Sequence, residues 1–102
     1  MVETYNGKIE GDKTIHRDLS LSGMITGSAT VAQGIVFELR GTVIGNLVVE
    51  RDALVHVYGT VCGDATNNGG HLNVFGTIMG RVFKRSGATH VDARAIVAGG
   101  VR

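Results

Sequence analysis

Apolar residues recur at every sixth position through the middle of the chain. Because six is even, this spacing fits a β-strand, in which alternate residues point to the same side. It does not fit an α-helix, in which six residues rotate by about 600° and leave any single face. The abundance of β-branched residues also favours strands. The run that shows the spacing without a break is Leu19, Ile25, Val31, Phe37, Val43, Val49, Val55 and Val61.

A longer repeat contains this spacing three times. Segments of the type Gly-Thr-Val-x-Gly begin at residues 7, 23, 41, 59 and 76, and a degenerate copy, AIVAG, begins at residue 95. The steps between them are 16, 18, 18, 17 and 19 residues. One step is too short for a pair of packed helices and suits one turn of a stacked solenoid. Three apolar positions per turn predict three faces, so we expect an all-β, single-domain triangular parallel β-helix of about five to six turns. Residues 7–102 form this domain, after an N-terminal segment of residues 1–6.

Stacked turns of this kind predict ladders of similar side chains inside the coil, which pack with few voids. A further inward column would end in an unpaired lysine, which is costly to bury. We therefore expect a register shift there, with Val82 or Phe83 turning inward. The three predicted ladders are Ile9, Ile25, Val43, Val61, Ile78 and Val97; Leu19, Phe37, Val55, Leu72 and Val91; and Leu21, Leu39, Val57, Val74 and Ala93. The doubtful column is Ile15, Val31, Val49, Asn67 and Lys84.

Composition and charge narrow the function classes. The chain carries 10 Lys+Arg and 9 Asp+Glu, so it lacks the basic excess typical of nucleic-acid binders. Its single cysteine, Cys62, excludes an internal disulfide and fits a reducing compartment. The N-terminus has no apolar signal region, and no apolar run approaches the roughly 20 residues that span a bilayer. We expect a cytoplasmic protein with no nucleic-acid partner and no membrane insertion.

The repeats resemble those of bactofilins, the polymer-forming cytoskeletal proteins of bacteria. The stretch GTVIGNLVVERDALVHVYGTVCGD, from Gly41 to Asp64, carries the family's G-x-[VI]-x-G-[DN] pattern. The resemblance covers Gly7 to Val101, although the chain contains none of the proline typical of bactofilin tails. It implies a right-handed triangular β-helix that joins end to end into nucleotide-free filaments and serves as a scaffold.

No motif for catalysis or cofactor binding is found, so we expect no enzyme activity, no catalytic residues and no cofactor. The spacing places no His beside a Ser or Cys nucleophile, and the glycines do not form a phosphate-binding loop. Hexapeptide acyltransferases share the six-residue period, but they need a protruding loop that this chain lacks. His71 and His90 each lie five residues before the start of a repeat, so we expect them to stack on adjacent turns. His56 lies three residues before a repeat start, in a column with Ser20, Glu38, Asn73 and Asp92. Imidazoles and carboxylates can bind zinc, but no two histidines are closely spaced, so a solvated polar column is favoured over a metal site.

Two outward columns are candidate contact surfaces. The first column consists of the residue directly before each repeat and begins at Ser22. It combines cations with aromatic rings, which form cation–π contacts and are enriched in binding hot spots. It is either a protein-contact wall or a ladder that stabilises only the surface. The second is an apolar stripe beside Thr42, Thr60 and Thr77, which a monomer would normally avoid; it is either a lateral contact or covered by residues 1–6. The contact wall is Arg40, Tyr58, Phe75 and Arg94, and the apolar stripe is Ile44, Cys62, Met79 and Ala98.

The two ends of the coil are the strongest candidates for self-association. A parallel β-helix leaves unpaired backbone groups on its first and last turns, and such edges pair with other chains unless they are covered. We expect Tyr5 and Ile9 at one end, and Val91 and Val97 at the other. Head-to-tail contacts give filaments and like-with-like contacts give a closed dimer; the resemblance favours head-to-tail. The predicted function is a self-associating structural scaffold. The alternative is a protein-binding module, of an inhibitor or immunity type, that uses the contact wall.

Overall fold

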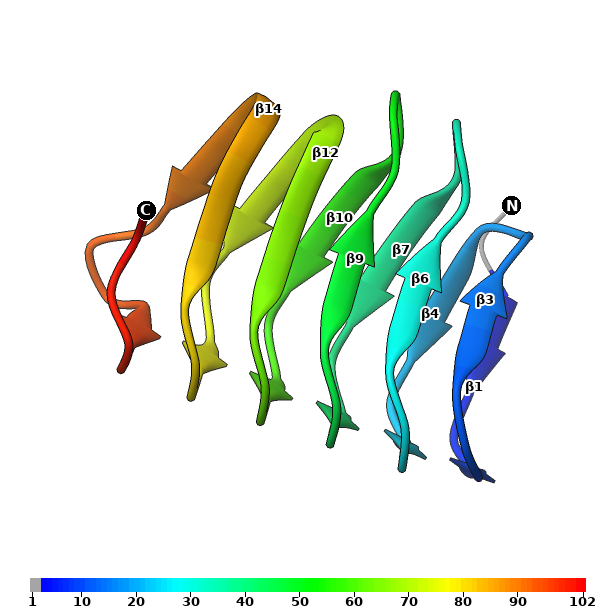
Figure 1. The fold of residues 1–102 in the computed structure, drawn as a ribbon. Coiled ribbons are helices and arrows are strands. Elements are labelled where there is room, and N and C mark those ends of the chain that lie inside the picture. Colours follow the sequence, from blue (N-terminus) through cyan, green and yellow to red (C-terminus); the bar gives the residue numbers. More distant parts are fainter. Residues whose placement is uncertain (1–2) are drawn as a thin grey trace.

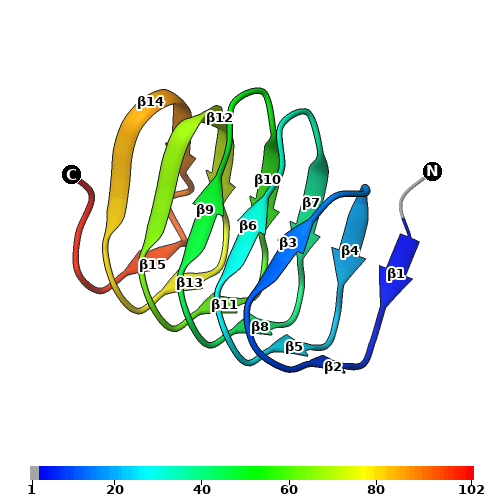
Figure 2. The ribbon, with the colours of Figure 1, turned by 45° about the vertical axis from the view of Figure 1, so that its right-hand side comes forward.

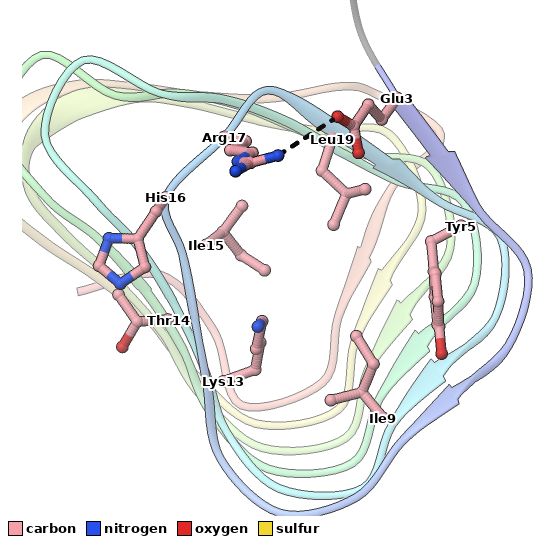
Figure 3. Close-up of a pocket in the computed structure, with 9 residues that line it drawn as sticks. All are labelled: Glu3, Tyr5, Ile9, Lys13, Thr14, Ile15, His16, Arg17 and Leu19. Carbon is pink, nitrogen blue, oxygen red and sulfur yellow. Dashed lines mark ion pairs between the residues drawn. The ribbon is translucent and has the colours of Figure 1, made fainter.

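The computed structural model, which describes residues 3–102, is a three-sided coil of stacked strands (Figures 1 and 2). Residues 3–102 contain no helix, and all strand pairings in this range are parallel. Viewed from its N-terminal end, the chain turns clockwise as it recedes, so the coil is right-handed (Figures 2 and 3). The predicted all-β, triangular parallel β-helix is therefore confirmed.

Each turn contributes one strand to each of three faces. The first face contains β1 (Glu3–Tyr5), β4 (Leu19–Leu21), β7 (Val36–Leu39), β10 (Leu54–Val57) and the C-terminal parts of β12 (Ala65–Val74) and β14 (Val82–Val91). The second face contains β2 (Lys8–Ile9), β5 (Met24–Ile25), β8 (Thr42–Val43), β11 (Thr60–Val61), β13 (Thr77–Ile78) and β15 (Ile96–Val97). The third face contains β3 (Lys13–Ile15), β6 (Ala29–Val31), β9 (Leu47–Val49) and the N-terminal parts of β12 and β14, and it ends in a bridge from Val82 to Val101. The coil therefore includes Glu3–Tyr5, which precede Gly7, the predicted start of the domain.

The ladder predicted on the second face is present along the whole coil. Its members pair in an unbroken series from Ile9 to Val97. On the first face, the predicted ladders hold from Leu19 to Leu72 and from Leu21 to Val74. The inner members are fully buried and form a single core.

The last turn differs from the prediction by two residues. Val91 pairs with Val74, and Thr89 pairs with Leu72, so the places predicted for Val91 and Ala93 are wrong. The cause is a short turn between β14 and β15. Within it, the Asp92 carboxylate accepts a hydrogen bond of 3.0 Å from the backbone N–H of Arg94. This turn adds residues to the last repeat. The sequence reflects it in the spacing of the repeats, because the last two repeats begin 19 residues apart whereas the two before begin 17 residues apart.

The doubtful column keeps its register as far as Lys84, because Asn67 pairs with both Val49 and Lys84. The predicted shift lies directly after this pair, between Asn67 and Asn68, and a second one follows before His71. Val82, one of the two residues predicted to turn inward, does so and is fully buried beside Ala65. Lys84 pays little desolvation free energy, because it lies on the last turn and its side chain is exposed.

Asn67 is buried without cost because its amide is fully hydrogen-bonded. Its Oδ1 accepts hydrogen bonds from the N–H groups of Gly69 and Gly70, at 3.1 and 2.9 Å. Its Nδ2 donates to the carbonyl oxygens of Gly70 and Ala88 and to the hydroxyl of Thr89. This one side chain therefore holds the corner that joins the two halves of β12.

Polar side chains also link one turn to the next at the corner between the second and third faces. The Asp12 carboxylate accepts a hydrogen bond from the N–H of Ser28, and the Ser28 hydroxyl accepts one from the N–H of Asn46. Asn46 and Asp64 continue the series toward Arg81. In the first four repeats, the Asp, Ser or Asn after the second glycine therefore accepts a hydrogen bond from a backbone N–H of the next turn.

Candidate functional site

The structure brings together three of the four residues predicted for the contact wall. The guanidinium carbon of Arg40 lies 4.8 Å from the centre of the Tyr58 ring, within cation–π range. The rings of Tyr58 and Phe75 stack with centroids 5.2 Å apart and an angle of 11°. Tyr58 is 44% exposed and Phe75 is 37% exposed, so the stack is accessible from solvent.

Arg94 does not belong to this column, so its predicted place is wrong. The residue that follows β14 at the level of Phe75 is Asp92, whose N–H donates to the carbonyl of Val74. Arg94 lies in the turn that lengthens the last repeat. The column therefore ends in an acidic residue, and the wall has a single cation, Arg40, which also lies 3.6 Å from the Glu38 carboxylate.

His56 is a further member of this cluster, which the sequence pattern did not predict. Its ring centroid lies 6.0 Å from that of Tyr58 and 6.1 Å from that of Phe75, in stacked arrangements. The sequence contains a signal for this contact, because His56 in β10 and Tyr58 directly after β10 are two positions apart, a spacing that places extended residues on the same side. We call Arg40, His56, Tyr58 and Phe75 the aromatic wall. Within residues 3–102, the buried Nδ1 atom of His56 has no hydrogen-bond partner.

The histidine columns are rearranged relative to the prediction. His71 pairs with Leu54 and Ala88, and not with His90. His90 instead continues the His56 column, beside Asn73, in the place predicted for Asp92. In the described part of the chain, no group of three or more His, Cys, Asp or Glu side chains could hold a metal ion.

The predicted apolar stripe runs along the outside of the second face. Backbone hydrogen bonds between turns place its four members at equivalent positions, and Ile44 and Met79 are 43% and 54% exposed. Cys62 is a free, exposed thiol. Because β1 pairs with β4 on the first face, Glu3–Tyr5 do not cover the stripe. Residues 1 and 2 of the predicted cover lie outside the described residues.

The N-terminal end of the coil is an open mouth. A hollow of about 500 Å³ lies there, and the side chains of Ile9, Ile15 and Leu19 point toward its centre (Figure 3). Tyr5, predicted at this end, lines one side and is 41% exposed. Glu3 lies at the rim, where its carboxylate is 3.9 Å from the guanidinium of Arg17.

The C-terminal end exposes the other two predicted residues. Val91 and Val97 end their ladders and are only partly buried, although they pack against the core. Ile96 and Val101 nearby are 60% and 43% exposed. All four residues predicted for self-association thus lie at the two ends of the coil, two at each.

Fold and surface together define the protein as a triangular β-solenoid with open ends and one exposed aromatic wall. Comparison of the chain with protein-family models, with curated proteins and with solved structures finds no match in any of the three. Among residues 3–102, no helix is long and apolar enough to cross a membrane.

Proposed function

We propose that this protein is a non-enzymatic, cytoplasmic scaffold that self-associates through the ends of its coil, in the manner of a bactofilin. The observation that carries the proposal is the state of the two ends. At the N-terminal end, β1, β2 and β3 each pair with a strand on one side only. At the C-terminal end, β15 and the last part of β14 do the same.

These edges are suited to pairing with another copy. Within the described residues, no helix or further strand covers them, and apolar side chains stand beside them at both ends. Free parallel edges next to apolar surface favour the addition of another strand. The repeat pattern that resembles bactofilins supports the same conclusion, since each turn of such a coil offers the same edge as the next.

Charge placed at the C-terminal end tests the proposal. Val97→Arg, alone and with Val91→Arg, should convert assemblies to monomers in analytical ultracentrifugation, because it introduces cations into the proposed contact. Thr30→Arg, outward on an inner turn, is the matched control and should assemble as the parent does. Circular dichroism checks that each variant is folded. Folded Val97→Arg variants that assemble normally would show that the ends are not the contact.

The second candidate function is a protein-binding module that uses the aromatic wall. The observation that favours it is the exposed stack of Arg40, Tyr58 and Phe75, which combines the residue types enriched in binding hot spots. Ultracentrifugation and electron microscopy of the parent protein separate the two functions. Concentration-dependent assemblies or filaments support the scaffold. A monomer at all concentrations removes the scaffold and leaves the binding module.

A further inference from the structure

Lys13 is the first member of a column that faces the interior of the coil. It pairs with Ala29, and the pairing continues from turn to turn as far as Val82. Residues that pair in register point to the same side of a sheet, so the Lys13 side chain extends from β3 into the N-terminal mouth (Figure 3). The other members of the column, all fully buried, are Ala29, Leu47, Ala65 and Val82.

The charged groups of the mouth leave Lys13 without a counter-charge. Glu3 is the one carboxylate among the described residues that line the hollow, and it already lies 3.9 Å from the guanidinium of Arg17. No carboxylate of residues 3–102 forms an ion pair with the Lys13 ammonium. The side chain of His16 points away from the centre (Figure 3). The mouth, with Lys13 and Arg17 against Glu3, is therefore positively charged.

The inner part of the mouth is apolar. Ile9 and Leu19 are partly buried and pack on the core, and Ile15 is 2% exposed. The ring of Tyr5 forms one wall (Figure 3). The hollow of about 500 Å³ lies in the size range of small-molecule sites, which are mostly apolar and use a few polar groups to orient the ligand.

These two parts of the mouth match the two parts of an amphipathic anion. Lys13 is exposed in the free protein, so water solvates its ammonium. A small hydrophilic anion would pair with Lys13 but leave Ile9 and Leu19 in water. An uncharged aliphatic molecule would cover these side chains but displace water from the ammonium without replacing its hydrogen bonds, which is costly. An aliphatic chain that ends in a carboxylate removes apolar surface from water and also accepts charge-assisted hydrogen bonds from Lys13.

We propose that the N-terminal mouth binds an aliphatic carboxylate, with the head group paired to Lys13 and the chain against Ile9, Leu19 and Tyr5. The site goes beyond the proposed scaffold function and does not rest on it, because all of its residues belong to one chain. Where N-terminal ends take part in association, the bound anion competes for the same apolar surface.

Calorimetric titration with octanoate tests the site, at a protein concentration at which ultracentrifugation finds the monomer. Octanoate should bind, whereas acetate, which has the head group without the chain, should give no measurable heat. Each methylene added from butanoate to octanoate should tighten binding roughly twofold, about half the effect of a fully buried methylene because the mouth is open. Octylamine, with a cationic head group, should not bind.

Two charge reversals on the first turn separate the mouth from the rest of the surface. Lys13→Glu should weaken octanoate binding at least about tenfold, since the carboxylate then meets a like charge. Lys8→Glu is the matched control, because Lys8 pairs with the exposed Met24 on the outside of the second face. Salt screens a charge at that distance, so binding should stay within about twofold of the parent. Circular dichroism checks that both variants fold.

Other outcomes overturn the proposal. Octanoate that fails to bind removes the site. Equal losses in the two variants would mean that net charge alone attracts the anion. Octanol that binds as tightly as octanoate would leave Lys13 without a part, and acetate that binds as tightly would leave the apolar surface without one. The result is independent of the scaffold: a parent that stays monomeric and binds octanoate loses the scaffold and keeps the site, whereas a parent that assembles without binding octanoate as a monomer loses only the site.

Discussion

The first glycine of the second to fifth repeats is required by the short distance to the preceding turn. A Cβ atom built at Gly41 would overlap the carbonyl oxygen of Gly23, and one at Gly59 would overlap that of Gly41. Both clashes are with backbone atoms, which cannot rotate away as a flexible side chain can. Gly34 has a different reason, since its φ of 75° lies in the left-handed region while the space around it is open. Asp52 takes the corresponding corner one turn later with a φ of 62°.

Two glycine substitutions separate these reasons. Gly59→Ala should lower the free energy of unfolding by about 1–3 kcal/mol, the usual cost of overpacking against atoms that cannot move aside. Gly34→Asn should stay within about 0.5 kcal/mol of the parent, because Asn tolerates left-handed backbone and meets no neighbour. Urea denaturation followed by circular dichroism measures both. Equal effects of the two substitutions would mean that backbone conformation, and not the approach of the turns, selects the glycine.

At the scale of elements, the ten-residue strands β12 and β14 replace the strand–turn–strand arrangement of the earlier turns. All four of these turns have a positive-φ residue near this corner, namely Gly34, Asp52, Gly69 and Gly87. In β12, however, the chain runs through Gly69 and Gly70 as one strand, and the Asn67 amide accepts hydrogen bonds from both glycine N–H groups. The sequence shows Asn67 as a polar residue in an apolar column. Its hydrogen bonds depend on the positions of backbone groups that the sequence pattern does not specify, so its role could not be predicted.

Removal of this amide should destabilise the C-terminal half of the coil. Asn67→Val fills the column with an apolar side chain but leaves the N–H groups of Gly69 and Gly70 without their acceptor. Each unsatisfied buried group costs about 1–3 kcal/mol. We expect a loss of at least about 2 kcal/mol in the free energy of unfolding by urea denaturation. Asn68→Ala is the control, since Asn68 is exposed and makes one contact of 3.4 Å with Glu50; an equal loss in both variants would contradict this role for Asn67.

The same scale shows why some of the candidate surfaces could be predicted and others could not. Arg40, Tyr58 and Phe75 each precede the first glycine of a repeat, so counting from that glycine places them correctly. Arg94 fails because the turn at Asp92 interrupts the count. The pairing of Glu3 with Leu19 was not predicted, because Glu3 lies before the first glycine of the first repeat, in the segment that was set apart from the coil.

At the scale of the whole molecule, stabilising contacts run between neighbouring turns. Strands pair with the turn before and the turn after, and the Asp, Ser and Asn side chains at the corners reach only one turn away. A coil held in this way has a stability that is approximately the sum of its turns and their junctions. The end turns, which lack one neighbour, are the least protected part of the protein.

The contacts from one turn to the next mean that the length of this protein can change only in whole modules. Deletion of residues 41–58 joins Arg40 to Gly59 and leaves each remaining corner facing an equivalent one, with Ser28 available to accept from the N–H of Asp64. We expect a shorter protein with the same β-type circular dichroism and a lower melting temperature, because less apolar surface is buried. Deletion of residues 41–49 removes half of one repeat. It places the apolar ladder residues of one turn next to the corner residues of the next turn, and it should abolish cooperative melting. Gene duplication of one repeat would, by the same reasoning, lengthen the coil without any redesign of its interior.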